Sequence, residues 1–221
     1  LAYSSPIDQL QNNHLGKNVF LQDKDGRLYI IYKNCLYVKQ NNKGDSWNMK
    51  VTDILTAAID PTNSNILYIV TTKNVVRKSM DAGQTWIDIT NGLSSSIYIS
   101  RILINPHDNN EVFLGSSFGL YKTSDAGFRW EQTSLKDNVI EIIINPKDKA
   151  KQYALTAAGL LFSKDEGQSW NRMDSALPKQ LIKGKGRSAK QIPLHVNSIT
   201  FANHSTPLLL AVTDETVEEG K

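Results

Sequence analysis

The sequence predicts an all-β protein made of repeated four-stranded sheets, and three observations lead to this prediction. One eight-residue pattern ending in tryptophan recurs along the chain, and the tryptophans are spaced 39, 44 and 40 residues apart. Each interval between them holds four short segments rich in β-branched and aromatic residues, a composition typical of strands. Apolar residues at helical spacing are nearly absent from these intervals.

The expected strands of one repeat are clearest between residues 99 and 133. The first is "ISRILINP"; the second, "EVFLGSS", follows an expected turn at "HDNN"; the third, "GLYKTS", follows a glycine; and the fourth, "RWEQTS", follows the recurrent pattern. An Asn-Pro or Asp-Pro pair closes the first strand in three repeats, at Pro61, Pro106 and Pro146. Proline lacks a backbone donor, so it suits the exit of a strand better than its interior.

The repeat length indicates the architecture. A period of about 40 residues with four strands per unit is typical of β-propellers, in which each sheet is a blade that buries its faces against neighbouring sheets. We therefore predict a single β-propeller domain over residues 1–221, partial in this chain. Because the last unit lacks two strands, we expect the remaining blades in a longer chain. The blades are expected at about 18–51, 54–90, 99–133 and 139–173, with an incomplete fifth at 196–213 and a basic insertion loop at 174–195.

Composition and charge argue against several classes of function. The formal net charge of +3 is too small to predict nucleic-acid binding. No run of about 18 apolar residues could span a membrane, and the single cysteine, Cys35, cannot form an internal disulfide. No spacing matches a metal site, no cofactor is predicted, and "DKDG" at residues 23–26 is expected to be a hairpin turn. The opening "LAYSSPIDQL" has no signal-peptide pattern, as in a processed protein, and we expect a secreted, periplasmic or cell-surface location.

The recurrent pattern is Ser/Thr-x-Asp-x-Gly-x-x-Trp, and its residue types fit a tight turn. A short carboxylate can accept hydrogen bonds from nearby backbone N–H groups, glycine permits positive φ, and tryptophan can cover the edge of the sheet. We expect a structural role, since aspartates repeated in different blades cannot all converge on one catalytic site. The three close copies contain Ser79, Asp81, Gly83 and Trp86; Thr123, Asp125, Gly127 and Trp130; and Ser163, Asp165, Gly167 and Trp170.

These residues resemble the Asp-box, also called the BNR repeat, and the chain is similar to Asp-box β-propellers. In a degenerate copy before Trp47, Gln40 and Asn42 replace the hydroxyl and the carboxylate. The resemblance covers about residues 18–173. The family includes sialidases, other glycoside hydrolases, sortilin-type receptors and photosystem assembly factors, so the resemblance implies the fold better than an activity. It also implies that the boxes lie between the third and fourth strands, away from the central pocket.

One functional hypothesis is a carbohydrate-active glycoside hydrolase, or a fragment of one. Such enzymes generally need two carboxyl groups about 5 to 10 Å apart. An acid within an apolar strand must be paired, solvated or functional, which draws attention to the inner strands. The arginine motif of sialidases is missing, and Tyr98 is expected to be a packing aromatic instead of a nucleophile. The weak catalytic candidates are Glu141, Asp60, Asp53 and Arg101.

The other hypothesis is a non-catalytic interaction module that binds a protein or a glycan through loops at one face of the propeller. The insertion after the fourth unit is basic and contains glycine and serine, so we expect a flexible loop able to attract an anionic ligand. We favour the interaction module because no pair of acids on the inner strands stands out, and the hydrolase is the alternative. The candidate ligand-binding residues of the insertion are Lys183, Lys185, Arg187 and Lys190.

Overall fold

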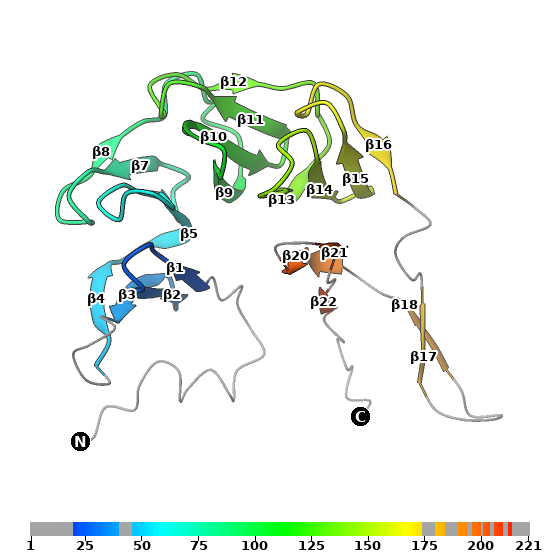
Figure 1. Cartoon of the computed structure of the whole chain (residues 1–221), viewed down its shortest axis with the longest axis horizontal. Helices are drawn as coiled ribbons and strands as arrows, with labels where there is room; N and C mark the ends of the chain where they lie inside the picture. The colour runs from blue at the N-terminus through cyan, green and yellow to red at the C-terminus, as the bar shows by residue number, and fades with distance from the viewer. Residues whose placement is uncertain are drawn as a thin grey trace. The chain divides into compact units, whose positions relative to one another are not determined.

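The structure is a computed structural model that describes residues 20–39, 46–173, 180–183, 190–193, 196–199, 201–203, 206–209 and 212–213 (Figure 1). Every regular element in these residues is a β-strand. In the same part of the chain, no helix is long and apolar enough to cross a membrane. Four of the sheets have four antiparallel strands each. The all-β propeller class predicted from the sequence is confirmed.

Each four-stranded sheet takes its strands from one sequence repeat, and neighbouring strands of a sheet are consecutive in the chain. We name these sheets I to IV. Sheet I contains β1 (Phe20–Gln22), β2 (Leu28–Tyr32), β3 (Cys35–Lys39) and β4 (Asn48–Val51), and sheet II contains β5 (Ile54–Ile59), β6 (Leu67–Thr71), β7 (Val76–Ser79) and β8 (Ile87–Asp88). Sheet III contains β9 (Ile99–Asn105), β10 (Asp108–Ser116), β11 (Gly119–Thr123) and β12 (Glu131–Gln132), and sheet IV contains β13 (Val139–Ile144), β14 (Gln152–Thr156), β15 (Gly159–Ser163) and β16 (Asn171–Arg172).

The second strand of sheet III begins earlier than expected. The "HDNN" segment was predicted as a turn, but β10 already starts at Asp108 and the turn is confined to Pro106 and His107. Asn105 Oδ1 accepts a hydrogen bond of 2.9 Å from the His107 backbone N–H. This side-chain bond closes the turn within two residues, so the polar residues that follow can join the strand.

The remaining strands form three pairs after residue 173. The segment expected as a flexible basic loop contains an antiparallel pair, and the segment expected as the first strands of a fifth unit pairs as an interrupted hairpin. Its register runs from Val196↔Thr213 to Asn203↔Thr206. The pairs are β17 (Gln180–Lys183) with β18 (Lys190–Pro193), β19 (Val196–Ser198) with β22 (Val212–Thr213), and β20 (Phe201–Asn203) with β21 (Thr206–Leu209).

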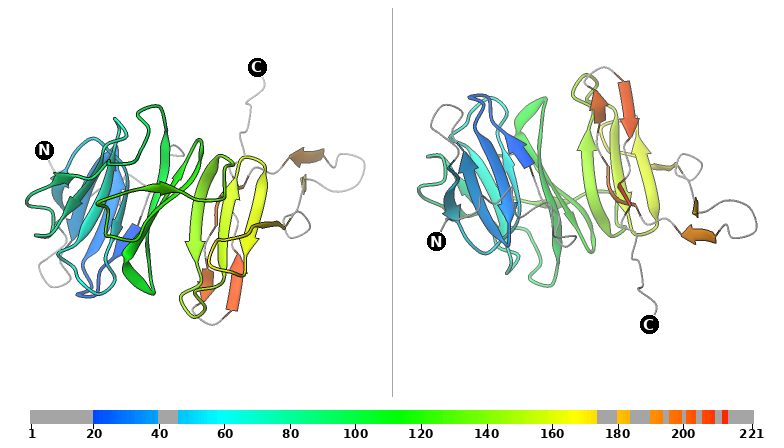
Figure 2. Two further views of the ribbon diagram at one scale, coloured as in Figure 1. Left: turned by 90° about the horizontal axis from the view of Figure 1, so that it is seen from above. Right: turned by 90° about the horizontal axis from the view of Figure 1, so that it is seen from below.

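The chain divides into two compact units, one of Leu1–Leu114 with Tyr121–Glu131 and the other of Gly115–Leu120 with Gln132–Lys221. In the first unit, the faces of sheets I and II pack together, as Figure 2 shows for the blue and cyan strands. In the second unit, side chains of sheet IV pack against Ile199. Buried side chains of this size each contribute about 1.5–3 kcal/mol to stability.

Strand β6 shows how the period-two pattern builds the core of the first unit. All five of its residues are buried. Leu67 and Ile69 face the cluster shared with sheet I, whereas Tyr68 and Val70 face the cluster that contains residues of β9 and β10. Successive side chains of a strand point to opposite faces, so one strand supplies two cores.

Candidate functional site

The recurrent turn after β7 is held by the side chains of its first and third residues. Ser79 Oγ accepts a hydrogen bond from Gly83 N–H at 2.8 Å and donates one to Asp81 Oδ1 at 2.8 Å. The same carboxylate oxygen accepts bonds from the backbone N–H groups of Gln84 and Thr85 at 2.9 and 2.8 Å. These bonds close the turn between the third and fourth strands, where the resemblance placed it.

The residue four positions after the aspartate differs among the three turns, and it changes the hydrogen bonding of the carboxylate. The hydroxyls of Thr85 and Ser169 donate to Oδ2 of Asp81 and Asp165, each at 2.5 Å. These hydroxyl bonds, followed by bonds from backbone N–H groups, lower the pKa of each aspartate to about 2. In the middle turn, the corresponding residue is Arg129, which has no hydroxyl. There the pKa of the carboxylate is also lowered, chiefly by the hydroxyl of the first residue of the turn, Thr123.

Each turn also binds the backbone at or next to the connection between the first two strands of its own sheet. The residue before the glycine has positive φ in all three turns, between 59° and 60°. In this conformation its N–H points at a backbone carbonyl of that connection or, in the middle turn, at a carbonyl near the start of β10. The bonds run from Ala82 to Asn65 at 3.0 Å, from Ala126 to Asn110 at 2.8 Å, and from Glu166 to Ala150 at 3.2 Å.

The middle turn joins two sheets of the first unit. Its carbonyl at Ala126 accepts hydrogen bonds from Tyr68 Oη and Lys78 Nζ, each at 3.2 Å. Burial lowers the pKa of the Lys78 ammonium. Gly127 has a φ of +101°, and a Cβ there would lie 2.5 Å from Ile89 Cδ1, so the close approach requires glycine. The described contacts of this turn connect two sheets, which is a structural role.

Two of the catalytic candidates are buried acids that bind backbone amides. Oδ1 of Asp60 accepts bonds from Thr62 N–H at 2.7 Å, Thr62 Oγ1 at 2.9 Å and Asn63 N–H at 3.0 Å, which form the turn after β5. Oε2 of Glu141 accepts the N–H of Ile199 at 2.8 Å. Charge-assisted bonds of this kind orient a carboxylate firmly, so both acids have identified structural partners.

The other candidates do not assemble with Asp60 into an acid pair. Asp53 is exposed and precedes β5, whereas Asp60 follows this six-residue strand. A strand rises about 3.3 Å per residue, so their Cα atoms lie about 20 Å apart, well beyond the spacing of about 5 to 10 Å in glycoside hydrolases. Arg101 lies in β9 of the first unit, whereas Glu141 lies in the second unit.

The four basic candidates of the insertion are only partly described. The backbone register of β17 and β18 places Lys183 directly opposite Lys190. Lys185 and Arg187 lie outside the described residues.

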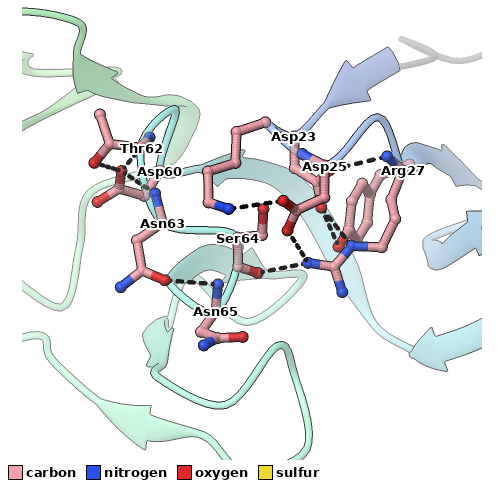
Figure 3. A network of polar contacts seen from close by, with 10 residues as sticks. Asp23, Asp25, Arg27, Asp60, Thr62, Asn63, Ser64 and Asn65 are labelled. Atoms are coloured by element: carbon pink, nitrogen blue, oxygen red, sulfur yellow. Dashed lines mark hydrogen bonds and ion pairs between the residues drawn. The ribbon is translucent and has the colours of Figure 1, made fainter.

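A buried aspartate that the sequence did not single out organises the turn expected at residues 23–26 (Figure 3). That turn follows β1, closed by a bond of 3.0 Å from Gly26 N–H to Asp23 O. Asp23 Oδ2 accepts bonds from Arg27 Nε at 2.6 Å and Tyr29 Oη at 3.2 Å. Arg27 also donates to the carbonyl of Ser64, in the connection between β5 and β6 of sheet II, at 3.3 Å. The network therefore ties sheets I and II, and burial raises the pKa of Tyr29 to about 12.

A polar surface strip lies where β2 and β6 end and where β5 and β9 begin. We call this strip the turn surface and define it as residues 32–34, 52–53, 72–74 and 98. Ile54 N–H donates to Asn34 O at 2.9 Å, and Thr72 N–H donates to Asp53 O at 2.7 Å. Ile99 N–H donates to Asn74 Oδ1 at 3.0 Å. Tyr98, expected as a packing aromatic, is 54% exposed at this surface.

Comparisons with known proteins support the fold. No family model matches the chain. A curated protein of Neosartorya fischeri, described as a "probable oligoxyloglucan-reducing end-specific xyloglucanase", is 30% identical over 79 residues, which are 34% of this chain and 10% of that protein. The chain thus spans only a small part of this relative.

Solved propeller structures of different function resemble the chain at low identity. An ancestral GH74 enzyme superposes with a TM-score of 0.59 at 17% identity, over 72% of this chain and 24% of that one. The GH74 xyloglucanase from Xanthomonas campestris gives 0.58 at 15% identity, over 90% and 36% of the two chains. YCF48 from Cyanidioschyzon merolae gives 0.55 at 14% identity, over 71% and 54%. At these identities, the similarity establishes a β-propeller fold and no activity.

Proposed function

We propose that the chain is a non-catalytic β-propeller interaction module that binds a partner through turns at one face of its sheets. The observation that carries this proposal is that the two buried candidate acids accept hydrogen bonds from backbone amides. Asp60 accepts three bonds that form its own turn, and Glu141 accepts the Ile199 amide. These bonds engage Oδ1 of Asp60 and Oε2 of Glu141 in holding the backbone, which is a structural use of both acids.

The turn surface supports the proposal because it combines exposure with a fixed backbone. Lys33, Asn34, Asp53 and Lys73 are exposed, while backbone hydrogen bonds hold the turns that carry them. Loops held by a rigid sheet are the usual place for recognition residues in proteins. We also propose a secreted, periplasmic or cell-surface location, in line with the similarity to an extracellular domain of a putative one component system from B. thetaiotaomicron.

A glycoside hydrolase is the second candidate, favoured by the segment of 79 residues shared with a xyloglucanase. In this case, the chain would supply part of a larger enzyme, since it matches 10% of that relative and 24% of the ancestral GH74 enzyme.

Turnover assays distinguish the two candidates. The purified chain is incubated with xyloglucan and a panel of other polysaccharides, and the release of reducing ends is measured. We expect no release above a heat-denatured control. Release that Asp60→Asn or Glu141→Gln abolishes, while thermal denaturation shows the variant still folded, would replace the proposal by the hydrolase. Glu131→Gln, at an exposed residue of β12, is the matched control.

A further inference from the structure

We infer that the turn surface binds an acidic polypeptide segment. This inference rests on the proposed function and names its partner. The surface belongs entirely to the first unit, and its residues come from the turns after β2 and β6 and from the connections before β5 and β9.

Hydrogen bonds make the turn surface continuous. The turn at Lys33 and Asn34 is bound to the start of β5 through the bond from Ile54 N–H to Asn34 O. The backbone carbonyl of Asp53, just before β5, accepts a hydrogen bond from the Thr72 N–H. This bond places the turn that contains Lys73 beside the start of β5. Side chains from three separate segments are therefore presented together, in positions fixed by the sheets beneath them.

Backbone strain is concentrated on this surface. Among the described residues, seven non-glycine residues have positive φ, and three of them lie in the recurrent turns. The other four are Lys33, Asn34, Asp53 and Asn74, with φ between 48° and 61°, and all four belong to the turn surface. Asparagine and aspartate tolerate this conformation, but lysine does so at a cost. Glycine would fit residue 33 better, so lysine occupies this position at a cost in backbone conformational energy.

The charge of the surface suits an acidic partner. Lys33 and Lys73 are exposed, and Asp53 lies between them along the hydrogen-bonded strip. Lys33 Nζ lies 5.2 Å from the centroid of the Tyr32 ring. This contact holds the ammonium over the surface and covers one face of the ring. The strip therefore offers two cations around one acid.

A peptide fits these groups better than a neutral glycan does. Sugars stack on open aromatic faces, but the ammonium of Lys33 lies over the Tyr32 ring, which leaves Tyr98 as the exposed aromatic residue of the strip. Tyrosine and asparagine near an exposed backbone are typical of polypeptide-binding loops, and the turn surface presents both, at Tyr98 and Asn34. Glutamate or aspartate side chains would pair with the two lysines.

The test uses the whole chain and two synthetic peptides. One alternates glutamate with serine and tyrosine, and the other has glutamine in place of each glutamate. Binding is measured by fluorescence anisotropy at low and high NaCl concentration. We expect preference for the glutamate peptide and weaker binding as salt rises, because exposed charges are screened. Equal binding of the two peptides, or binding of neither, overturns the inference.

Three single variants locate the site. Lys33→Ser and Lys73→Ser should each weaken binding of the glutamate peptide about two- to fivefold, the range for exposed charge pairs. Asp53→Asn should strengthen binding by a similar factor, because it removes the acid between the lysines. Lys147→Ser, at an exposed lysine after β13 in the second unit, should leave binding unchanged. If Lys147→Ser lost binding while the three variants of the turn surface bound normally, the site would lie elsewhere.

The outcomes also separate this inference from the proposed function. Binding of neutral glycans without turnover, unaffected by Lys33→Ser, would overturn the acidic peptide and keep the interaction module. Turnover that depends on Asp60 or Glu141 would overturn the interaction module itself.

Discussion

Trp130 Nε1 donates a hydrogen bond of 2.6 Å to the backbone carbonyl of Ile89, 41 residues earlier in the chain. The indole is 2% exposed and lies in the cluster that contains side chains of sheets II and III. Its own backbone N–H donates to Asn91 O at 2.9 Å, and a Cβ on Gly92 would lie 2.2 Å from its carbonyl. One tryptophan thus fixes the chain between β8 and the next repeat.

Trp130→Phe should lower the free energy of unfolding by about 2 kcal/mol, because the change leaves a buried carbonyl without its donor and reduces the buried ring. Trp130→Ala should cost about 3–5 kcal/mol. Urea denaturation followed by circular dichroism measures both values. Trp86→Phe, at a partly buried ring, is the control and should cost less. Equal costs for the two phenylalanine variants would contradict the assigned role.

Asp81 should make stability depend on pH in the acidic range. Its pKa is about 2 in the folded chain against an ordinary value of 3.8, so the unfolded chain binds more protons between these values. Its contribution is fully present above about pH 4 and is lost as the pH falls to about 2. Asp81→Asn should therefore flatten the rise of the melting temperature with pH in this range.

The hydroxyl of Thr85 provides a finer test of the same carboxylate. It is the largest cause of the lowered pKa of Asp81, so Thr85→Val should raise that pKa and narrow the pH range over which stability is lost. Titration of the carboxyl carbon by NMR measures the shift. An unchanged titration in Thr85→Val would show that the backbone amides and the Ser79 hydroxyl set the value.

Arg129→Thr should make the middle turn equivalent to the other two. The new hydroxyl can donate to Asp125 Oδ2 as Thr85 and Ser169 donate to their aspartates. The pKa of Asp125, already lowered, should then fall further, toward that of its counterparts. Ser169→Arg is the reciprocal variant and should raise the pKa of Asp165. NMR titration of both variants provides the measurement.

Lys33→Gly should stabilise the fold and weaken binding at the turn surface. The lysine has a φ of 48°, and relief of this strain, less the entropy that glycine loses on folding, should add about 0.5–1 kcal/mol. Lys39→Gly, within β3, should have the opposite sign because glycine weakens a strand. Denaturation curves and peptide binding are measured on the same samples. A destabilised Lys33→Gly would contradict the strain argument.

The strands of the four sheets could be predicted because their pattern is local. Strand β6, for example, reads as a short apolar run bounded by polar residues, and its burial follows from this pattern. The recurrent turn could be predicted as well, because the side-chain hydrogen bonds that close it join residues at most four positions apart, such as Ser79 and Gly83. Hydrogen bonds within one turn require particular residue types at a fixed spacing, so the sequence pattern predicts them.

The environment of the acids could not be predicted, because their partners lie in distant segments. Glu141 binds an amide 58 residues away, and Arg27 reaches a carbonyl 37 residues away. Asp60 is an instructive exception. Its bonds are local, within three residues, and the sequence "DPTN" already indicated a side-chain-capped turn.

The double role of β6 determines where this chain can change in length. A single inserted residue within the strand would turn its remaining side chains to the opposite face and exchange the partners of both cores at once. The connections have no such restriction: two residues separate β4 from β5, ten separate β8 from β9, and six separate β12 from β13. Length variation among the repeats is therefore best tolerated at junction residues outside the core, and in the ten-residue junction the exposed residues 94–96 are the natural place to graft a foreign epitope.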